Sequence, residues 1–79
     1  MAVRVRLFAA LRDLAGASEV SSEAGTVGGV LEDLAARFGE EFARIAASGS
    51  VVVDGERVGP ERPVAGVGEV AVLPPFSGG

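Results

Sequence analysis

One amphipathic helix stands among short segments that alternate like strands, and this order leaves few folds open to the chain. Thr26 is a favourable N-cap for the helix, and Gly39 ends it. Its apolar stripe repeats at helical spacing and consists of Val27, Val30, Leu31, Leu34 and Phe38. A single stripe of this kind needs a sheet to cover it. The sequence therefore predicts a two-layer α+β domain, with one main helix packed on one mixed sheet.

The N-terminal segment predicts a half-buried strand, because apolar and polar residues alternate over residues 3–8. The aliphatic side chains face the core, and the opposite face carries Arg4, Arg6 and Phe8. Residues 9–15 lose this alternation and are rich in helix formers. They predict a short helical turn that ends at Gly16, with Leu11 and Leu14 beneath the sheet.

The rest of the chain supplies the other elements. Residues 17–23 indicate a weak edge strand, and residues 40–47 indicate a second short helix. Asp54-Gly55 joins two valine-containing segments and favours a two-residue type I′ hairpin turn. Residues 69–73 alternate again and predict the last strand. The inward-facing side chains expected in these segments are Phe42, Ile45, Val70 and Val72.

Composition excludes most side-chain catalysis. The 79 residues contain no Cys, His, Lys, Tyr or Trp, and all seven basic residues are Arg. Without Cys or His there is no thiolate nucleophile, no imidazole base and no typical metal site. The net charge of −4 disfavours nucleic acid and anionic membranes as partners. With no signal peptide and no apolar run of membrane-spanning length, we expect a single cytoplasmic domain that acts as a carrier, an interaction module or a subunit of a larger assembly.

The C-terminal tail is the first candidate functional segment. Pro74 and Pro75 stop the last strand and keep the following residues extended. Gly78 and Gly79 have no side chain, so they can enter a narrow channel and carry the terminal carboxylate into a partner's active site. The alternative is a frayed, functionless end in a glycine-rich chain.

An exposed apolar patch is the second candidate. If the first and last strands are neighbours, Phe8 and Leu73 share the outer face of the sheet, and Phe76 continues that line. The alternative places Phe8 in the core. Arg4 and Arg6 on the same face either pair with acidic groups of a partner or are solvated. A third set of residues predicts a solvated helix surface rather than a cation site and comprises Glu32, Asp33, Glu40 and Glu41.

Three segments carry a combined pattern: residues 5–16 (VRLFAALRDLAG), 53–56 (VDGE) and 68–79 (GEVAVLPPFSGG). Together they resemble the ubiquitin-like sulfur carriers of the MoaD/ThiS type, and the first resembles the small subunit of molybdopterin synthase in particular. The resemblance covers essentially the whole chain. The resemblance implies a β-grasp fold, with one mixed sheet on one main helix and short accessory helical turns. Residues 1–73 would form the domain, and 74–79 an extended, flexible tail.

The resemblance also implies a chemistry and a set of partners. A ubiquitin-activating-like adenylyltransferase, which supplies ATP and Mg²⁺, would adenylate the carboxylate of Gly79. A sulfur donor would then displace AMP and leave a thiocarboxylate. The large subunit of molybdopterin synthase would accept the tail in a heterotetramer, and the sulfur would pass to a pterin precursor. Gly78 would provide clearance in the channel, and this chain would bind no cofactor or metal itself.

Partner contacts follow from the same resemblance. They would be made by Phe8, Leu73, Pro75, Phe76 and Arg57. Arg57 departs from the family pattern, because relatives often place an apolar contact residue there. Three other functions stay open: a carrier for thiamine, cysteine or thio-metabolite synthesis, a ubiquitin-like protein modifier, and an interaction module with an idle tail.

Overall fold

The computed structural model describes residues 2–75 and has a five-stranded sheet with the strand order β2-β1-β5-β3-β4. β1 and β5 run parallel, and the other neighbouring strands are antiparallel, so the sheet is mixed. The elements are β1 (Val3–Leu7), α1 (Ala9–Ala15), β2 (Glu19–Ser22), α2 (Val27–Phe38), α3 (Glu40–Ser48), β3 (Ser50–Val53), β4 (Glu56–Val58) and β5 (Val70–Leu73).

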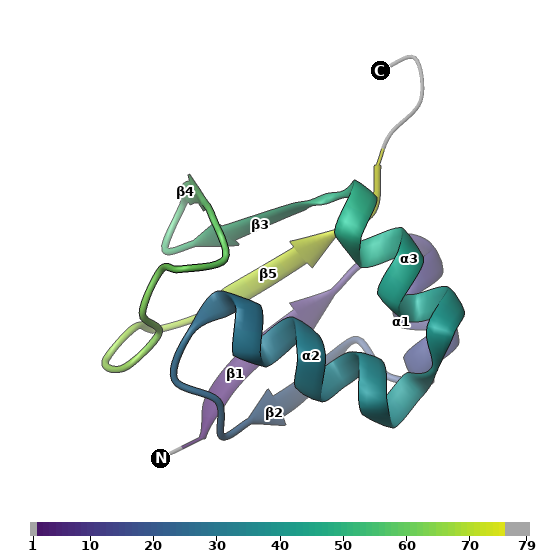
Figure 1. The fold of residues 1–79 in the computed structure, drawn as a ribbon, viewed down its shortest axis with the longest axis horizontal. Helices are drawn as coiled ribbons and strands as arrows, with labels where there is room; N and C mark the ends of the chain where they lie inside the picture. Colours follow the sequence, from purple (N-terminus) through teal and green to yellow (C-terminus); the bar gives the residue numbers. More distant parts are fainter. Residues whose placement is uncertain (1, 76–79) are drawn as a thin grey trace.

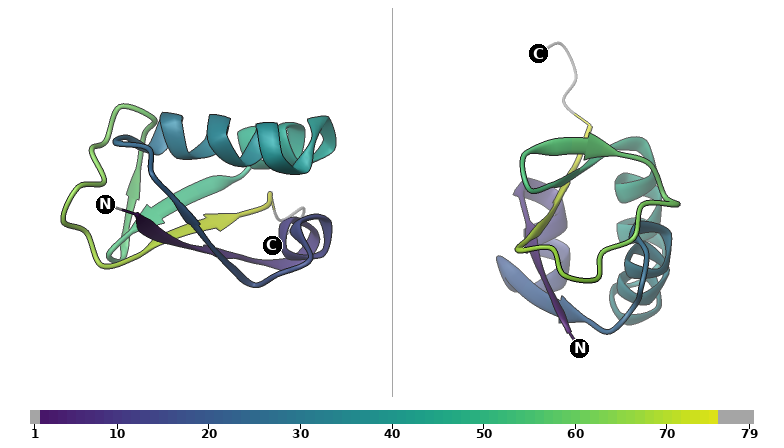
Figure 2. Two further views of the ribbon diagram at one scale, coloured as in Figure 1. Left: turned by 90° about the horizontal axis from the view of Figure 1, so that it is seen from below. Right: turned by 90° about the vertical axis from the view of Figure 1, so that its left-hand side faces the viewer.

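The elements form two layers, as the sequence predicts. α2 and α3 cover one face of the sheet, and α1 lies at the end of the sheet near α3 (Figures 1 and 2). The core lies between the layers, and its largest fully buried side chains are Phe42, Leu7, Leu11, Leu34, Val5, Val27, Val30, Val53, Val70 and Val72. No helix within residues 2–75 has the length and apolar character needed to cross a membrane.

A short-range sequence signal defines the start of α2. The hydroxyl of Thr26 accepts a hydrogen bond from the amide of Gly29 at 3.1 Å, which confirms the predicted N-cap. Gly28 belongs in this first turn because of a tertiary contact. Its amide donates to the Pro60 carbonyl at 2.8 Å, and an added Cβ would lie 3.2 Å from that oxygen. The loss of helix propensity at Gly28 is therefore offset by close packing.

The predicted hairpin turn is confirmed and also supports the central strand. Asp54 and Gly55 both have positive φ, at 49° and 87°, as a type I′ turn requires. The Asp54 carboxylate accepts hydrogen bonds from the amides of Gly68 and Glu69 at 3.2 and 3.3 Å. The turn thus holds the chain just before β5 begins.

Two expectations were wrong. Leu14 was expected beneath the sheet but is 38% exposed, whereas Leu11 on the same helix is fully buried. Because α1 lies at the end of the sheet, only the side of this helix that meets α3 and β5 is covered. Asp33 was expected to be solvated, but its Oδ2 accepts hydrogen bonds from Ser22 Oγ at 2.6 Å and Arg37 Nη1 at 3.4 Å. The contact with Ser22 joins α2 to the edge strand β2, whereas Arg37 lies on α2 itself.

Replacing Ser22 by Ala is expected to lower the free energy of unfolding by about 2 kcal/mol, because the hydrogen bond to the charged Asp33 carboxylate is lost, together with the one that Ser22 Oγ accepts from the amide of Ala24. Ser22 is only 2% exposed, so water replaces these bonds poorly. Urea denaturation measures the effect. Ser21→Ala is the matched control: Ser21 is exposed, and it contributes its carbonyl to Arg37, a contact that survives the substitution. Equal losses in the two variants would contradict the assigned role of Ser22.

Candidate functional site

The candidate site is the end of the sheet where β5 finishes and the tail begins. β5 is the central strand and runs toward the end of the sheet at which α1 and α3 lie (Figure 1). Leu73 ends the strand and is half-buried, Pro74 is buried, and Pro75 is exposed. The globular packing therefore includes Pro74, and Pro75 lies on the surface.

β1 and β5 are parallel neighbours, so both strands finish at the same end of the sheet. The predicted apolar patch depends on this arrangement. Leu7 is the partner of Val72, and both face the core. The next residue on each strand is Phe8 and Leu73, respectively, and both are half-buried. Phe8 therefore lies outside the buried core. The two apolar side chains stand at adjacent strand ends beside the exit of the tail.

Arg6 organises the outer face next to this patch. Its guanidinium lies 5.7 Å from the centre of the Phe8 ring, in a cation–π contact. Its Nε also pairs with Glu69 Oε2 at 3.6 Å, across from β1 to the residue that precedes β5. Both charged side chains are more than one-third exposed, so the ion pair adds little to the stability of the fold.

A hydrogen bond to Ser50 links Arg57 to the end of β5. Arg57 is exposed, and its Nη2 donates to Ser50 Oγ at 3.0 Å. Ser50 is in turn the antiparallel partner of Leu73. The structure thus brings Phe8, Leu73 and Pro75 to one end of the sheet. Arg57 lies on the edge strand β4, opposite Val52, and is linked to this end only through Ser50. Phe76, Gly78 and Gly79 lie outside the described residues. Their roles as partner contacts or sulfur acceptor stay predictions.

Gly49 is the residue of this site that the sequence analysis missed. It joins α3 to β3, and a Cβ placed on it would overlap the carbonyl oxygen of Leu73. The same Cβ would lie 2.9 Å from the Leu73 carbonyl carbon and 3.0 Å from Pro74 Cα. A glycine after a helix is too common to have signalled this contact, which joins residues far apart in the chain.

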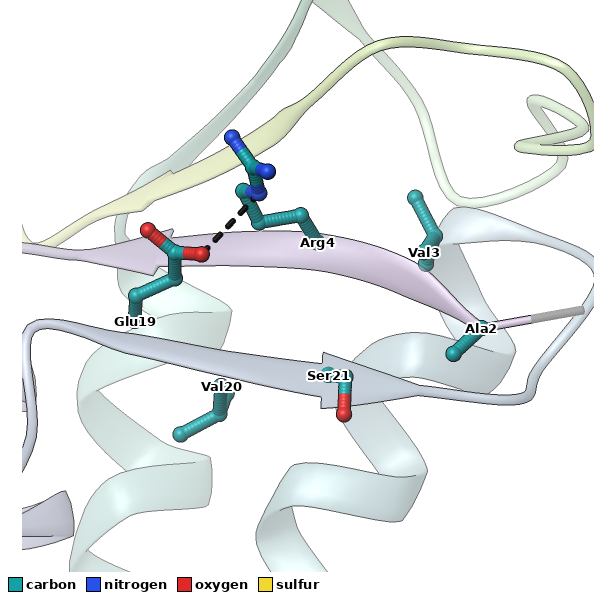
Figure 3. Close-up of a pocket in the computed structure, with 6 residues that line it drawn as sticks. All are labelled: Ala2, Val3, Arg4, Glu19, Val20 and Ser21. Carbon is teal, nitrogen blue, oxygen red and sulfur yellow. Dashed lines mark ion pairs between the residues drawn. The ribbon is translucent and has the colours of Figure 1, made fainter.

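The far end of the outer face is charged and self-paired. Arg4 Nε and Glu19 Oε2 are 3.0 Å apart, and Figure 3 shows this pair bridging β1 and β2. It borders a depression of about 340 Å³ that is lined by Ala2, Val3, Arg4, Glu19, Val20 and Ser21. Arg4 therefore has an acidic partner within its own chain.

The structure offers no metal centre in the described part of the chain. No group of three His, Cys, Asp or Glu residues among residues 2–75 is arranged to hold an ion. Of the acidic set on the helices, Asp33 is bonded to Ser22 and Arg37, and Glu41 pairs with Arg44 at 3.8 Å. A cavity of about 580 Å³ lies near Val3 and Val64, at the opposite end of β1 from the tail exit.

Comparison with known proteins adds three findings. A family model described as the ThiS family matches residues 5–79. The chain is similar to the crystal structure of small archaeal modifier protein 1 from Haloferax volcanii, with 26% identity over all of both chains and a TM-score of 0.78. It is also similar to a putative molybdopterin converting factor subunit 1 from Pyrococcus furiosus, with 26% identity, 96% and 99% coverage, and a TM-score of 0.75.

A more distant structure shares the fold. It is a complex of subunits 1 and 2 of molybdopterin-converting factor from Helicobacter pylori, with 17% identity, full coverage of both chains and a TM-score of 0.66. The search of curated proteins gives no match. The similar structures confirm the β-grasp fold, and the family match extends over nearly the whole sequence, including the tail. The chain belongs to the ThiS family and is a ubiquitin-like sulfur carrier or modifier of the ThiS/MoaD type.

Proposed function

We propose that this protein carries sulfur on its C-terminal glycine for molybdopterin synthesis. The observation that carries the proposal is the extent of the family match, which runs through Gly78 and Gly79 to the last residue. The similarity to the Pyrococcus furiosus subunit favours the molybdopterin pathway among the possible acceptors. The exposed start of the tail at Pro75, beside the patch of Phe8 and Leu73, supplies a surface for a partner that accepts the tail.

The proposed chemistry makes an unreactive carboxylate into an acyl donor. A carboxylate oxygen of Gly79 attacks the α-phosphorus of ATP, and pyrophosphate leaves with the electrons of the broken P–O bond. Hydrosulfide from a sulfur donor then attacks the acyl carbon. AMP leaves, and loss of the sulfhydryl proton gives the thiocarboxylate. An adenylyltransferase supplies the ATP, the Mg²⁺ and the catalytic side chains, which suits a chain without Cys, His or Lys.

The second partner is a large synthase subunit that accepts the loaded tail. The Helicobacter pylori structure is a complex of two converting-factor subunits, which supports a partner of this kind. We expect it to contact Phe8, Leu73, Pro75, Phe76 and Arg57. In that complex the sulfur would pass to a cyclic pterin precursor, and two copies of each subunit would form a heterotetramer.

The test is an intact mass of the protein after incubation with ATP, Mg²⁺, a sulfide source and a candidate adenylyltransferase. We expect a gain equal to the exchange of one oxygen for one sulfur, and fragmentation should place it on Gly79. The loaded chain, mixed with a large subunit and the pterin precursor, should then return to its original mass. No gain, with an enzyme that loads its own carrier in parallel, would refute the proposal. Loading without transfer to the pterin would redirect it to thiamine, cysteine or another thio-metabolite.

Protein modification is a second candidate, because the similar Haloferax volcanii structure is a small archaeal modifier protein. In that case Gly79 forms an isopeptide bond with a lysine of a target. The 79 residues contain no lysine, so one conjugated copy offers no side-chain amine for a second. Conjugates resolved by mass should therefore carry one copy per modified lysine. Their appearance after adenylation, without sulfur transfer, would favour the modifier over the carrier.

A further inference from the structure

We propose that Gly49 is a positioning residue, which sets the point where the reactive tail leaves the domain. The inference rests on the proposed function for its reaction, but its geometry stands independently. The space for a Cβ on Gly49 is taken by the backbone of Leu73 and Pro74. Gly49 has φ −95°, outside the left-handed region that favours glycine. The close approach to the tail, rather than backbone conformation, therefore requires glycine here.

Other contacts hold the same point from both sides. Ser50, which follows Gly49, is the strand partner of Leu73, while β1 flanks β5 on its other side. The amide of Gly49 donates to the Ala46 carbonyl at 3.1 Å, so the junction also belongs to the end of α3. Pro74 is buried and its ring restricts the backbone. It is the last buried residue that the structure describes.

Pro74 is the origin of the tail, and the number of residues after it limits how far the reactive carboxylate can lie from the domain. Residues 75–79 follow Pro74, and five extended residues span at most about 18 Å. A partner bound at the end of the sheet must therefore hold its reacting group within about 18 Å of Pro74. Moving the origin changes the position of the Gly79 carboxylate relative to that group. Misplacement by about 1 Å can lower a rate by roughly 100-fold.

The variant that tests this role is Gly49→Ala, and the chain offers a matched control. A Cβ on Gly25 would meet nothing within 4 Å, so Gly25→Ala makes the same chemical change in open space. The rate of pyrophosphate release measures adenylation of the carrier and gives kcat and KM separately. Circular dichroism measures whether each variant is folded. We expect Gly25→Ala to behave as wild type. Gly49→Ala should lower kcat by about 10- to 100-fold at a temperature where it is folded, with a smaller change in KM.

Rescue by tail length separates positioning from a purely structural role. One glycine inserted between Pro75 and Phe76 adds up to about 3.6 Å of reach. In the Gly49→Ala background this insertion should recover part of the lost kcat, whereas added tail length cannot repair a damaged fold. Equal kcat for Gly49→Ala and Gly25→Ala, or absence of rescue, overturns the inference. Failure of wild type to be adenylated would instead refute the proposed function.

A second readout does not depend on activity. The chain has no cysteine, so Ser77→Cys provides a unique site for a nitroxide label. Paramagnetic broadening of backbone amides then reports where the tail lies relative to the domain. We expect Gly25→Ala to keep the wild-type pattern and Gly49→Ala to change it; an unchanged pattern overturns the inference. If Gly49→Ala does not fold, Pro74→Gly takes its place, because it frees the same anchor without adding a Cβ. An unchanged broadening pattern in Pro74→Gly then overturns the inference.

Discussion

Deletion of Gly79 is expected to lower adenylation and thiocarboxylate formation by at least about 100-fold, although the shortened chain still ends in glycine. The deletion brings the terminal carboxylate closer to Pro74 by one residue, up to about 3.6 Å. An adenylating site that aligns the carboxylate with the α-phosphorus of ATP does not tolerate an error of that size. Pyrophosphate release and intact mass measure the two steps separately.

The control for this deletion keeps the tail length. Ser77→Ala changes a side chain next to the terminal glycines but leaves five residues after Pro74 and both glycines in place. It should retain loading close to that of wild type. If the chain without Gly79 is loaded as fast as Ser77→Ala, the last residue is not the sulfur acceptor, and the carrier proposal fails at its central point.

Phe42→Ala is expected to cost about 3–5 kcal/mol of unfolding free energy, the largest stability loss among our predictions. Phe42 is the largest fully buried side chain among residues 2–75, with 0% exposure, and its ring centre lies 5.3 Å from that of Phe38. The substitution removes the ring and leaves a cavity between α3 and its neighbours. Because small domains have a total stability of only about 5–15 kcal/mol, a large part of it would be lost. Urea denaturation followed by circular dichroism measures this change.

Phe38→Ala is the matched control, because it removes the other ring of the same pair. Phe38 is half-buried and packs at the margin of the core, so water already reaches part of it. Its loss should be clearly smaller than that of Phe42→Ala. Similar losses for the two variants would mean that the ring pair, rather than the burial of Phe42, determines the stability of this region.

Much of the fold was predictable because the signals for it are local. A stripe at helical spacing and a capping Thr26 define α2, and Asp54-Gly55 defines the turn of the hairpin. Inward-facing Phe42, Val70 and Val72 follow from spacing within their own segments. Such signals depend on residues a few positions apart, and the preferences of the backbone are expressed there without help from the rest of the chain.

Local sequence signals predicted only part of the candidate site. The apolar character of Phe8 and Leu73 was visible, but their placement at adjacent strand ends depended on the parallel pairing of β1 with β5. The polar contacts of Asp33 with Ser22 and of Arg6 with Glu69 also join separate elements. Residue type suggested that Asp33 and Arg6 face outward; the partner of each was decided by strand order and by helix placement.

Gly49 and Leu14 show most clearly where local sequence stops being informative and tertiary packing decides. Gly49 must be glycine because the backbone of Leu73 and Pro74 approaches it from a strand more than 20 residues away in the sequence. Leu14 is exposed because α1 lies at the end of the sheet, although its helical spacing from Leu11 suggested burial. Local sequence thus specified the elements, their inward faces and a tail suited to a carrier. Packing in three dimensions determined which surfaces meet and where that tail begins, since both depend on contacts between residues distant in the chain.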